Sequence, residues 1–165
     1  MRQDTEQKIR ELFYEHPGRK FTIREISKLT GVPRATAHKQ LLKLKGSKLI
    51  GKNNMSDDNL LFKIKKINYF TEKLVYSGLI EELVEKLNPS CIILFGSIRK
   101  GDSAKESDID LFVESSVKKN VELNKFERKL GHKVQLLVES DIKKLPKNLL
   151  SNVVNGIKIY GSFKI

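Results

Sequence analysis

The sequence has little that would place the protein in a membrane or an oxidising compartment. Its longest uninterrupted apolar run is the five residues Cys91–Phe95, whereas a membrane-spanning helix needs about 20. The start, Met1–Glu6, lacks the apolar core of a secretion signal. Cys91 is the single cysteine, so it forms no internal disulfide or cysteine-based zinc site, and its apolar neighbours predict a buried packing role. We therefore expect a cytoplasmic protein with no membrane partner.

Acidic residues are scarce in the first part of the chain. Residues 1–67 hold 16 Lys and Arg against 7 Asp and Glu, whereas residues 68–165 hold 16 against 13. The formal net charge of +12 therefore divides into +9 and +3. Such a basic module favours a polyanionic partner, most often nucleic acid. A lysine-rich solvated surface is the alternative that charge alone leaves open.

Two helices are predicted at the start of the chain. Apolar residues at helical spacing predict a helix over residues 5–15, and the breaker residues 16–18 end it. Thr22 followed by Glu25 has the spacing of a capping box, which satisfies free backbone N–H groups where a helix starts. The buried stripe predicted for this second helix is Ile23, Ile26 and Leu29.

A third helix and a hairpin are predicted next. A tight turn over residues 30–33 leads into a helix from Pro33 to about Lys45, which contains no acidic residue. Two short strands, Leu49–Lys52 and Leu60–Ile64, are predicted on either side of a loop of turn-forming residues. The core-facing positions predicted for the third helix are Ala37, Leu41 and Leu44.

The run Thr22–His38 resembles winged helix-turn-helix transcription regulators, and the likeness extends over most of residues 1–67. It implies an α+β module of three helices and a hairpin wing, whose third helix enters the DNA major groove. Protein docking is the alternative use of such a module. The residues implied to read bases or line the groove are Arg34, Thr36, His38 and Lys39, and those implied to contact phosphates are Lys43, Lys45, Lys48 and Lys52.

The second part of the chain begins with helical periodicity over residues 69–87, interrupted at Ser77-Gly78. We therefore expect a first domain over residues 1–67, a linking helical segment over 68–88 and a second domain over 89–165. Cys91–Phe95 is a continuous apolar run of strand length, typical of a strand buried on both faces. The Gly96-Ser97 that follows allows a sharp turn and close approach to a ligand.

Asp108 and Asp110 form an Asp-x-Asp pair in a predicted strand, with ten residues between Ser97 and Asp108. Because strand side chains alternate between faces, the two carboxylates share a face about 7 Å apart. Two such carboxylates repel unless a hard divalent cation such as Mg²⁺ lies between them. Such a cation can also neutralise and orient a triphosphate.

Gly96–Gly101 followed by Ser107–Leu111 resembles the minimal nucleotidyltransferases of the DNA polymerase β superfamily, over about residues 79–161. The resemblance implies an α/β domain with a small mixed sheet that uses a nucleoside triphosphate (NTP) and Mg²⁺ or Mn²⁺. It implies metal binding and catalytic roles for Asp108 and Asp110. The residues implied to hold the triphosphate are Gly96, Ser97, Arg99 and Lys100, although the two cations are equally compatible with a solvated surface.

One position departs from this pattern. The family's third carboxylate lies on the next strand, where the matching residue is Gln135. Glutamine has no negative charge and accepts no proton from a hydroxyl at neutral pH. Glu139 shares that strand face, but four residues along a strand is about 13 Å, too far without a bulge. We expect His132, beside the strand, to be exposed.

Two functions follow from these patterns. The first is a DNA-binding transcription regulator whose nucleotidyltransferase-like domain binds NTP and Mg²⁺ but is weak or inactive as an enzyme. The second is an active metal-dependent nucleotidyltransferase that moves a nucleoside monophosphate, for instance AMP, to a protein or another acceptor hydroxyl. The corresponding partners are double-stranded DNA, a nucleoside triphosphate, a second copy of the chain and a paired toxin protein.

Overall fold

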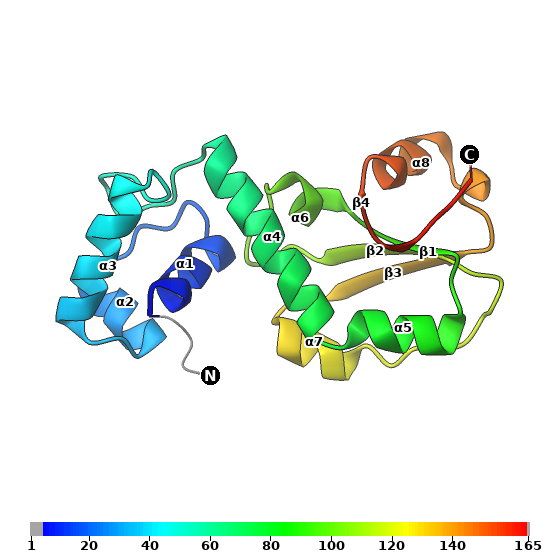
Figure 1. The fold of residues 1–165 in the computed structure, drawn as a ribbon, viewed down its shortest axis with the longest axis horizontal. Coiled ribbons are helices and arrows are strands. Elements are labelled where there is room, and N and C mark those ends of the chain that lie inside the picture. Colours follow the sequence, from blue (N-terminus) through cyan, green and yellow to red (C-terminus); the bar gives the residue numbers. More distant parts are fainter. Residues whose placement is uncertain (1–4, 165) are drawn as a thin grey trace. The chain divides into compact units, whose positions relative to one another are not determined.

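The computed structural model describes residues 5–164, in two compact units that meet in the chain at Tyr69 and Phe70. Each unit has its own core, and both are drawn in Figure 1. None of the helices among residues 5–164 is both long and apolar enough to span a membrane.

The first unit contains the three predicted helices, α1 (Thr5–Glu15), α2 (Ile23–Thr30) and α3 (Arg34–Gly46). The capping box at the start of α2 is confirmed: the Glu25 N–H donates to Thr22 Oγ1 (3.2 Å), and the Thr22 N–H donates to Glu25 Oε2 (2.8 Å). Gly31, with φ of 70°, ends α2 in the left-handed conformation, so the chain turns sharply into α3.

The predicted core face of α3 is confirmed, because Ala37, Leu41 and Leu44 are all buried. They pack with residues of α1 and with Ile26 of α2 in one cluster. The prediction for α2 is partly wrong, since Leu29 in its last turn is exposed.

Helix α4 (Leu60–Tyr76) replaces the second strand of the predicted wing, so the strand expected over Leu60–Ile64 is wrong. Asn59 starts this helix, because its Oδ1 accepts the N–H of Phe62 (2.9 Å). From Phe62 the buried positions recur every four residues along α4, which is a helical period and not a strand period.

What remains of the predicted wing is a tight loop between α3 and α4. It contains one isolated bridge, between Ile50 and Ser56, and the Gly51 N–H donates to the Met55 carbonyl oxygen (2.8 Å). The loop lies against Phe21, whose N–H donates to the Asn54 carbonyl oxygen (3.1 Å).

The second unit is built on a four-stranded sheet in the order β3-β2-β1-β4. Strand β1 is antiparallel to β2 and β4, and β2 is parallel to β3, so the predicted small mixed sheet is confirmed. Helix α4 ends at Tyr76 and the next helix begins at Leu79, which matches the predicted break. The elements are α5 (Leu79–Leu87), β1 (Cys91–Phe95), α6 (Gly96–Lys100), β2 (Ile109–Glu114), α7 (Asn124–Leu130), β3 (Val134–Glu139), a 3₁₀ turn (Ile142–Lys144), α8 (Lys147–Val154) and β4 (Ile157–Gly161).

Helices cover both faces of this sheet. Figure 1 shows α8 on one face and α5 with α7 on the other. All five residues of β1 are buried, as the apolar run predicts. Cys91, Ile93 and Phe95 pack with Val153 of α8 in one cluster. Burial raises the pKa of the Cys91 thiol to about 11, so the thiol is protonated at neutral pH and has a packing role.

Candidate functional site

The turn after β1 lies against the first acidic residue of β2. Phe95, the last residue of β1, is opposite Asp110 in the antiparallel pairing. Gly96 follows with φ of 73°, in the left-handed region, and a Cβ built on it would lie 2.8 Å from Cγ of Asp110. The sharp turn expected at Gly96 is therefore present, and only glycine has both the backbone freedom and the small size that this position needs.

Asp108 and Asp110 lie at the start of β2. The strand begins at Ile109, whose N–H donates to the Lys133 carbonyl oxygen (2.8 Å), so Asp108 comes directly before the strand. Asp108 is exposed and Asp110 is half-buried. Burial and, second, the negative charge of Asp108 raise the pKa of Asp110. Two carboxylates that repel each other at the start of a strand are suited to binding a hard divalent cation, because the cation removes that repulsion.

Gln135 lies beside Asp110. The parallel pairing of β2 with β3 places these two residues opposite each other, and the Gln135 side chain is exposed. Its amide is neutral, with one carbonyl oxygen as a ligand and two N–H donors. The residue of β3 that lies beside the aspartate pair therefore adds no negative charge.

Lys133 is a residue of this site that sequence reasoning missed. Its ammonium group pairs with Glu127 at 2.9 Å. This partner raises the pKa of Lys133, and Asp108 adds a smaller increase in the same direction. The signal was present in the spacing: Lys133 directly precedes β3 and lies two residues before Gln135, just as Asp108 directly precedes β2 and lies two residues before Asp110.

Glu139 does not replace the missing carboxylate. It is opposite Glu114 at the far end of β3, and β2 pairs with β3 in regular register throughout. The N–H of Ser140 donates to Glu139 Oε1 (2.7 Å) and lowers the pKa of that carboxyl. Within residues 5–164 no three His, Cys, Asp or Glu side chains are grouped to hold a metal ion.

The four residues predicted to bind phosphates lie together on α6, which starts directly after β1. Ser97 and Arg99 are half-buried, and Lys100 is exposed. The Asp102 N–H donates to the Ser97 carbonyl oxygen (3.1 Å), and Gly101, with φ of 76°, ends the helix. The Gly96 turn and Asp110 therefore adjoin each other at one end of the sheet, and Arg99 and Lys100 follow in the same short helix.

His132 is buried, with 5% of its surface exposed, so the expected exposed position is wrong. Its ring meets the Phe70 ring edge to face, with centroids 5.3 Å apart. Nδ1 lies 2.8 Å from the Ser107 carbonyl oxygen, which can only accept, so Nδ1 donates. His132 thus holds the residue next to Asp108 in place.

Helix α3 exposes most of the residues predicted to contact DNA bases. Arg34, His38 and Lys39 are exposed, and Thr36 is half-buried. Arg34 and His38 are four residues apart, so they lie on one face of the helix.

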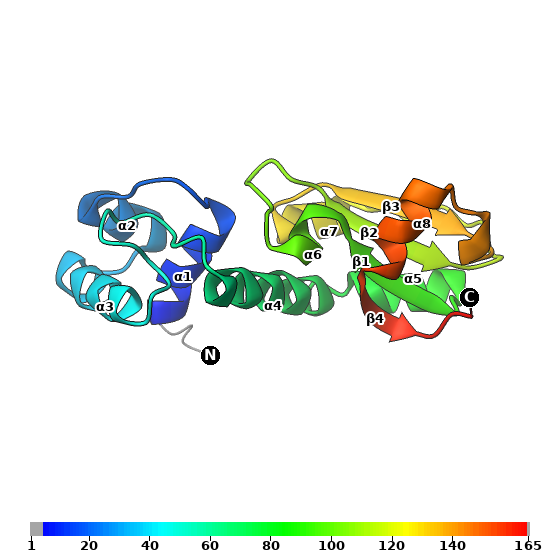
Figure 2. The same ribbon diagram turned by 90° about the horizontal axis from the view of Figure 1, so that it is seen from above.

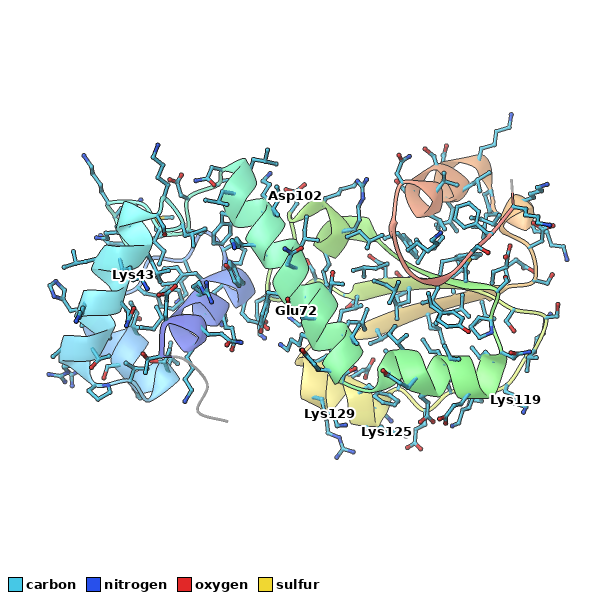
Figure 3. All side chains as sticks on the ribbon, viewed as in Figure 1. Lys43, Glu72, Asp102, Lys119, Lys125 and Lys129 are labelled. Atoms are coloured by element: carbon cyan, nitrogen blue, oxygen red, sulfur yellow. The ribbon has the colours of Figure 1, made fainter. Side chains whose placement is uncertain are left out.

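The predicted phosphate contacts are less uniform. Lys43, labelled on α3 in Figure 3, forms an ion pair with Glu6 at 2.5 Å. Lys45 donates to the Lys52 carbonyl oxygen (3.1 Å). The Lys48 and Lys52 side chains are exposed. Two of the four lysines are therefore engaged within the first unit.

Comparison with protein families finds one match. A family model described as a nucleotidyltransferase domain matches residues 76–160, just over half of the chain, including α6, both aspartates and Gln135. The sequence matches none of the curated proteins.

Proposed function

The chain belongs to the nucleotidyltransferase domain family, and from that premise we propose that it is a DNA-binding transcription regulator whose second unit binds NTP with Mg²⁺ without transferring a nucleotide. The observation that carries the proposal is that Gln135, and not an acidic residue, pairs with Asp110. The second unit thus has the turn and the aspartate pair suited to binding a nucleotide, and it lacks the third carboxylate that nucleotide transfer would use.

The binding half of the proposal rests on α6 and the start of β2. Backbone N–H groups of the Gly96 turn and the Ser97 hydroxyl can donate to phosphate oxygens, and Arg99 and Lys100 add positive charge. Asp108 and Asp110 would hold Mg²⁺ or Mn²⁺, which supplies charge neutralisation to the triphosphate.

The lack of transfer follows from proton chemistry. An acceptor hydroxyl must lose its proton when it attacks, and a nearby carboxylate is a group that can take it. The Gln135 amide cannot, and Lys133, which is protonated and paired with Glu127, only donates. A bound nucleotide in this site would therefore remain intact and act as a signal.

The DNA-binding half rests on charge and exposure in the first unit. The excess of +9 lies in residues 1–67, and α3 contains no acidic residue. Arg34 and Lys39, both exposed near the start of α3, are suited to base edges or phosphates.

The nucleotide half is tested by thermal unfolding with ATP, CTP or GTP and Mg²⁺, and by pyrophosphate release. We expect at least one NTP to raise the melting temperature, and Asp108→Asn to abolish the rise. Wild-type protein should release no pyrophosphate, whereas Gln135→Asp should gain release, and Asn152→Asp on α8 is the charge-matched control. If no NTP raises the melting temperature, the binding half is wrong.

A second candidate function is favoured by the same intact turn and aspartate pair. It is the transfer of a nucleoside monophosphate, such as AMP, to a hydroxyl of a protein partner such as a paired toxin. Measurable pyrophosphate release by the wild type, at the rate of the Gln135→Asp variant, would overturn the inactive function and favour this one.

The DNA half is tested by the salt dependence of duplex binding. We expect affinity to fall steeply with salt, with a logarithmic slope of about −0.9 for each phosphate contacted. A double variant with Arg34→Ala and Lys39→Ala should bind the duplex more weakly than the wild type at the same salt concentration. An affinity that does not change with salt would contradict DNA binding.

A further inference from the structure

Strand β3 is an edge strand of the second unit's sheet. It stands at one end of the strand order, and among residues 5–164 it pairs with β2 alone. Figure 2 shows β3 along one margin of the sheet and β4 along the other. The β4 margin has an irregular pairing with β1 and the exposed Lys158, whereas β3 pairs in regular register and has no charged residue from 134 to 138. Irregular pairing and lysines discourage further pairing at a sheet edge, so β3 is the edge that is open to another strand.

Two hydrogen bonds to β2 fix the direction of the backbone groups of β3. The Lys133 carbonyl oxygen accepts the N–H of Ile109 (2.8 Å), and the Glu139 carbonyl oxygen accepts the N–H of Ser115 (2.9 Å). Backbone groups alternate in direction along a strand. The N–H and C=O groups of residues 134, 136 and 138 therefore point away from β2, and those of residues 135 and 137 point toward it.

The outward N–H groups at the two ends of β3 already have acceptors. The Val134 N–H donates to Glu127 Oε1 (3.0 Å), and the Ser140 N–H donates to Oε1 of the residue before it (2.7 Å). Between these ends, the N–H groups of Leu136 and Val138 have no acceptor among residues 5–164. The open part of the edge is thus a short stretch between two capped positions, and a further strand is the partner that satisfies such groups.

We propose that the protein forms a homodimer in which β3 of one copy pairs antiparallel with β3 of a second copy, about a two-fold axis at Leu137. Leu136 of each copy is then opposite Val138 of the other, because both lie one residue from the axis. Opposite residues that face each other in this way exchange both N–H···O=C bonds. All open donors of the edge are used, and the two four-stranded sheets become one.

The capped positions select this register. An axis at Leu137 pairs open residues with open residues and leaves the capped ones opposite each other, where the contact ends. An axis at Leu136 would bring the Val138 carbonyl oxygen of the second copy against the Glu127 carboxylate that holds Val134. An axis at Val138 would bring the Leu136 carbonyl oxygen against the capping carboxylate at Ser140. Both alternatives place two acceptors together and lose hydrogen bonds.

The side chains are complementary about the same axis. Opposite residues of an antiparallel pair share a face, so Leu136 packs beside Val138 and Leu137 beside its own copy, and all three are half-buried. Gln135 and Glu139 each lie two residues from the axis, so they are opposite each other. The exposed Gln135 amide can donate to the Glu139 carboxylate of the second copy. A second copy of this strand therefore supplies every group that the edge needs, which favours it over an unrelated strand.

The contact is small. Strand β3 has six residues and is about 20 Å long, so the interface is smaller than standard and its dissociation constant is expected in the micromolar range. Gln135 is the one residue that it shares with the proposed function. The tests below use neither nucleotide nor DNA, so a failure of the dimer and a failure of the proposed function are separate results.

The oligomeric state is tested by sedimentation equilibrium of the full chain at about 1 to 200 µM. The mass should approach twice 18.9 kDa as the concentration rises. Gln135→Glu places a like charge opposite Glu139 twice in each dimer and should weaken it roughly two- to thirtyfold. Asn152→Glu, the same change at an exposed position of α8, should dimerise as the wild type does. Wild-type protein that stays monomeric throughout this range overturns the proposal.

The register is tested by exchanging the two side chains. Gln135→Glu combined with Glu139→Gln restores an amide opposite a carboxylate, and it should recover wild-type affinity, which loss of folding could not mimic. A double variant that dimerises no better than Gln135→Glu alone overturns the register.

Amide hydrogen exchange identifies the backbone groups that pair. The N–H groups of Leu136 and Val138 should exchange quickly in dilute protein and more slowly as the concentration rises through the dimer transition. The Leu137 N–H, which points toward β2, should be protected at every concentration. Exchange at Leu136 and Val138 that does not change with concentration contradicts pairing at this edge.

The position of the axis is tested by disulfide capture, against a low background because Cys91 is fully buried. Leu137→Cys protein should crosslink with itself on oxidation, because the two sulfurs meet at the axis. Leu136→Cys protein should not, because its copy lies diagonally across the pair, about 7–8 Å away and beyond the reach of a disulfide. Crosslinking of Leu136→Cys in preference to Leu137→Cys places the axis elsewhere and overturns the proposed pairing.

Discussion

The α-carbon of Gly96 lies against the carboxyl group of Asp110, closely enough that a Cβ on Gly96 would stand 2.8 Å from Asp110 Cγ. The turn after β1 and the acidic position on β2 are therefore one structural unit. A change at either residue displaces the other, and both adjoin the place assigned to the triphosphate.

Replacement of this glycine should damage stability and nucleotide binding together. Gly96→Ala should cost about 1–2 kcal/mol for the left-handed backbone alone, and more because Asp110 must move. Urea unfolding measures the first effect, and the NTP-induced rise in melting temperature measures the second. Gly46→Ala is the matched control, because Gly46 lies in α3 with open space around it. Wild-type stability in the Gly96→Ala variant would contradict the close packing at Asp110.

Asp110 should lower stability as the pH rises. Its pKa is raised above the ordinary aspartate value of 3.8 in the folded protein. At pH values just above 3.8 the folded state therefore binds more protons than the unfolded state. Unfolding free energy therefore falls as the pH rises through this window, and the loss persists at neutral pH. Asp110→Asn should raise the melting temperature at pH 7. It should also make the melting temperature depend less on pH in the acidic range.

Asp108→Asn is the comparison for this experiment. It removes only the second cause of the shift, so its effect should have the same sign and a smaller size. A lower melting temperature of Asp110→Asn at pH 7, measured by differential scanning calorimetry, would mean that the ionised carboxylate is stabilising.

The capping box of α2 should contribute measurably to the first unit. Thr22→Ala removes the acceptor for the Glu25 N–H and should cost about 1 kcal/mol of unfolding free energy. Thr22→Ser retains the hydroxyl and should stay close to wild type. Urea denaturation followed by circular dichroism compares the three proteins, and equal midpoints for all of them would refute the capping role.

Two lysines of α3 should differ in their effect on DNA. Lys39 makes no side-chain hydrogen bond or ion pair within residues 5–164, whereas Lys43 is paired with Glu6. Lys39→Ala should therefore lower the affinity for duplex DNA and reduce the size of the logarithmic salt slope by about one. Lys43→Ala should change the affinity and the slope less. Fluorescence anisotropy at several salt concentrations measures both quantities. A larger loss in Lys43→Ala than in Lys39→Ala would contradict this assignment.

Glu6 provides an independent check of the same contact. Glu6→Gln frees the Lys43 ammonium group and should raise duplex affinity, because one more cation becomes available to phosphate. An affinity no higher than that of the wild type would show that Lys43 takes no part in binding.

The elements that could be predicted depend on local signals. The capping box at Thr22, the apolar run Cys91–Phe95 and the break at Ser77-Gly78 each lie within a few residues of the structure that they produce. Gly96 and the Asp-x-Asp pair were also evident, because turn chemistry and alternation along a strand are short-range properties.

What sequence reasoning got wrong or missed depends on partners distant in the chain. Leu60–Ile64 has strand-like composition, but it continues into a helical period that extends to Tyr76, so it is the start of α4. The burial of His132 comes from Phe70, 62 residues earlier, and the Ser107 carbonyl group. No local pattern specifies such contacts.

The residues of this protein determined by themselves where its helices and buried strand form, how its charge divides, and that an Asp-x-Asp pair follows a Gly-Ser turn. Only the tertiary structure decided the register that pairs Gln135, the position indicated by the resemblance, with Asp110, and showed that Lys133 adds a positive charge near Asp108. The physical reason is that strand register is a long-range property. It is set by hydrogen bonds and side-chain packing between segments that the chain separates by about 25 residues.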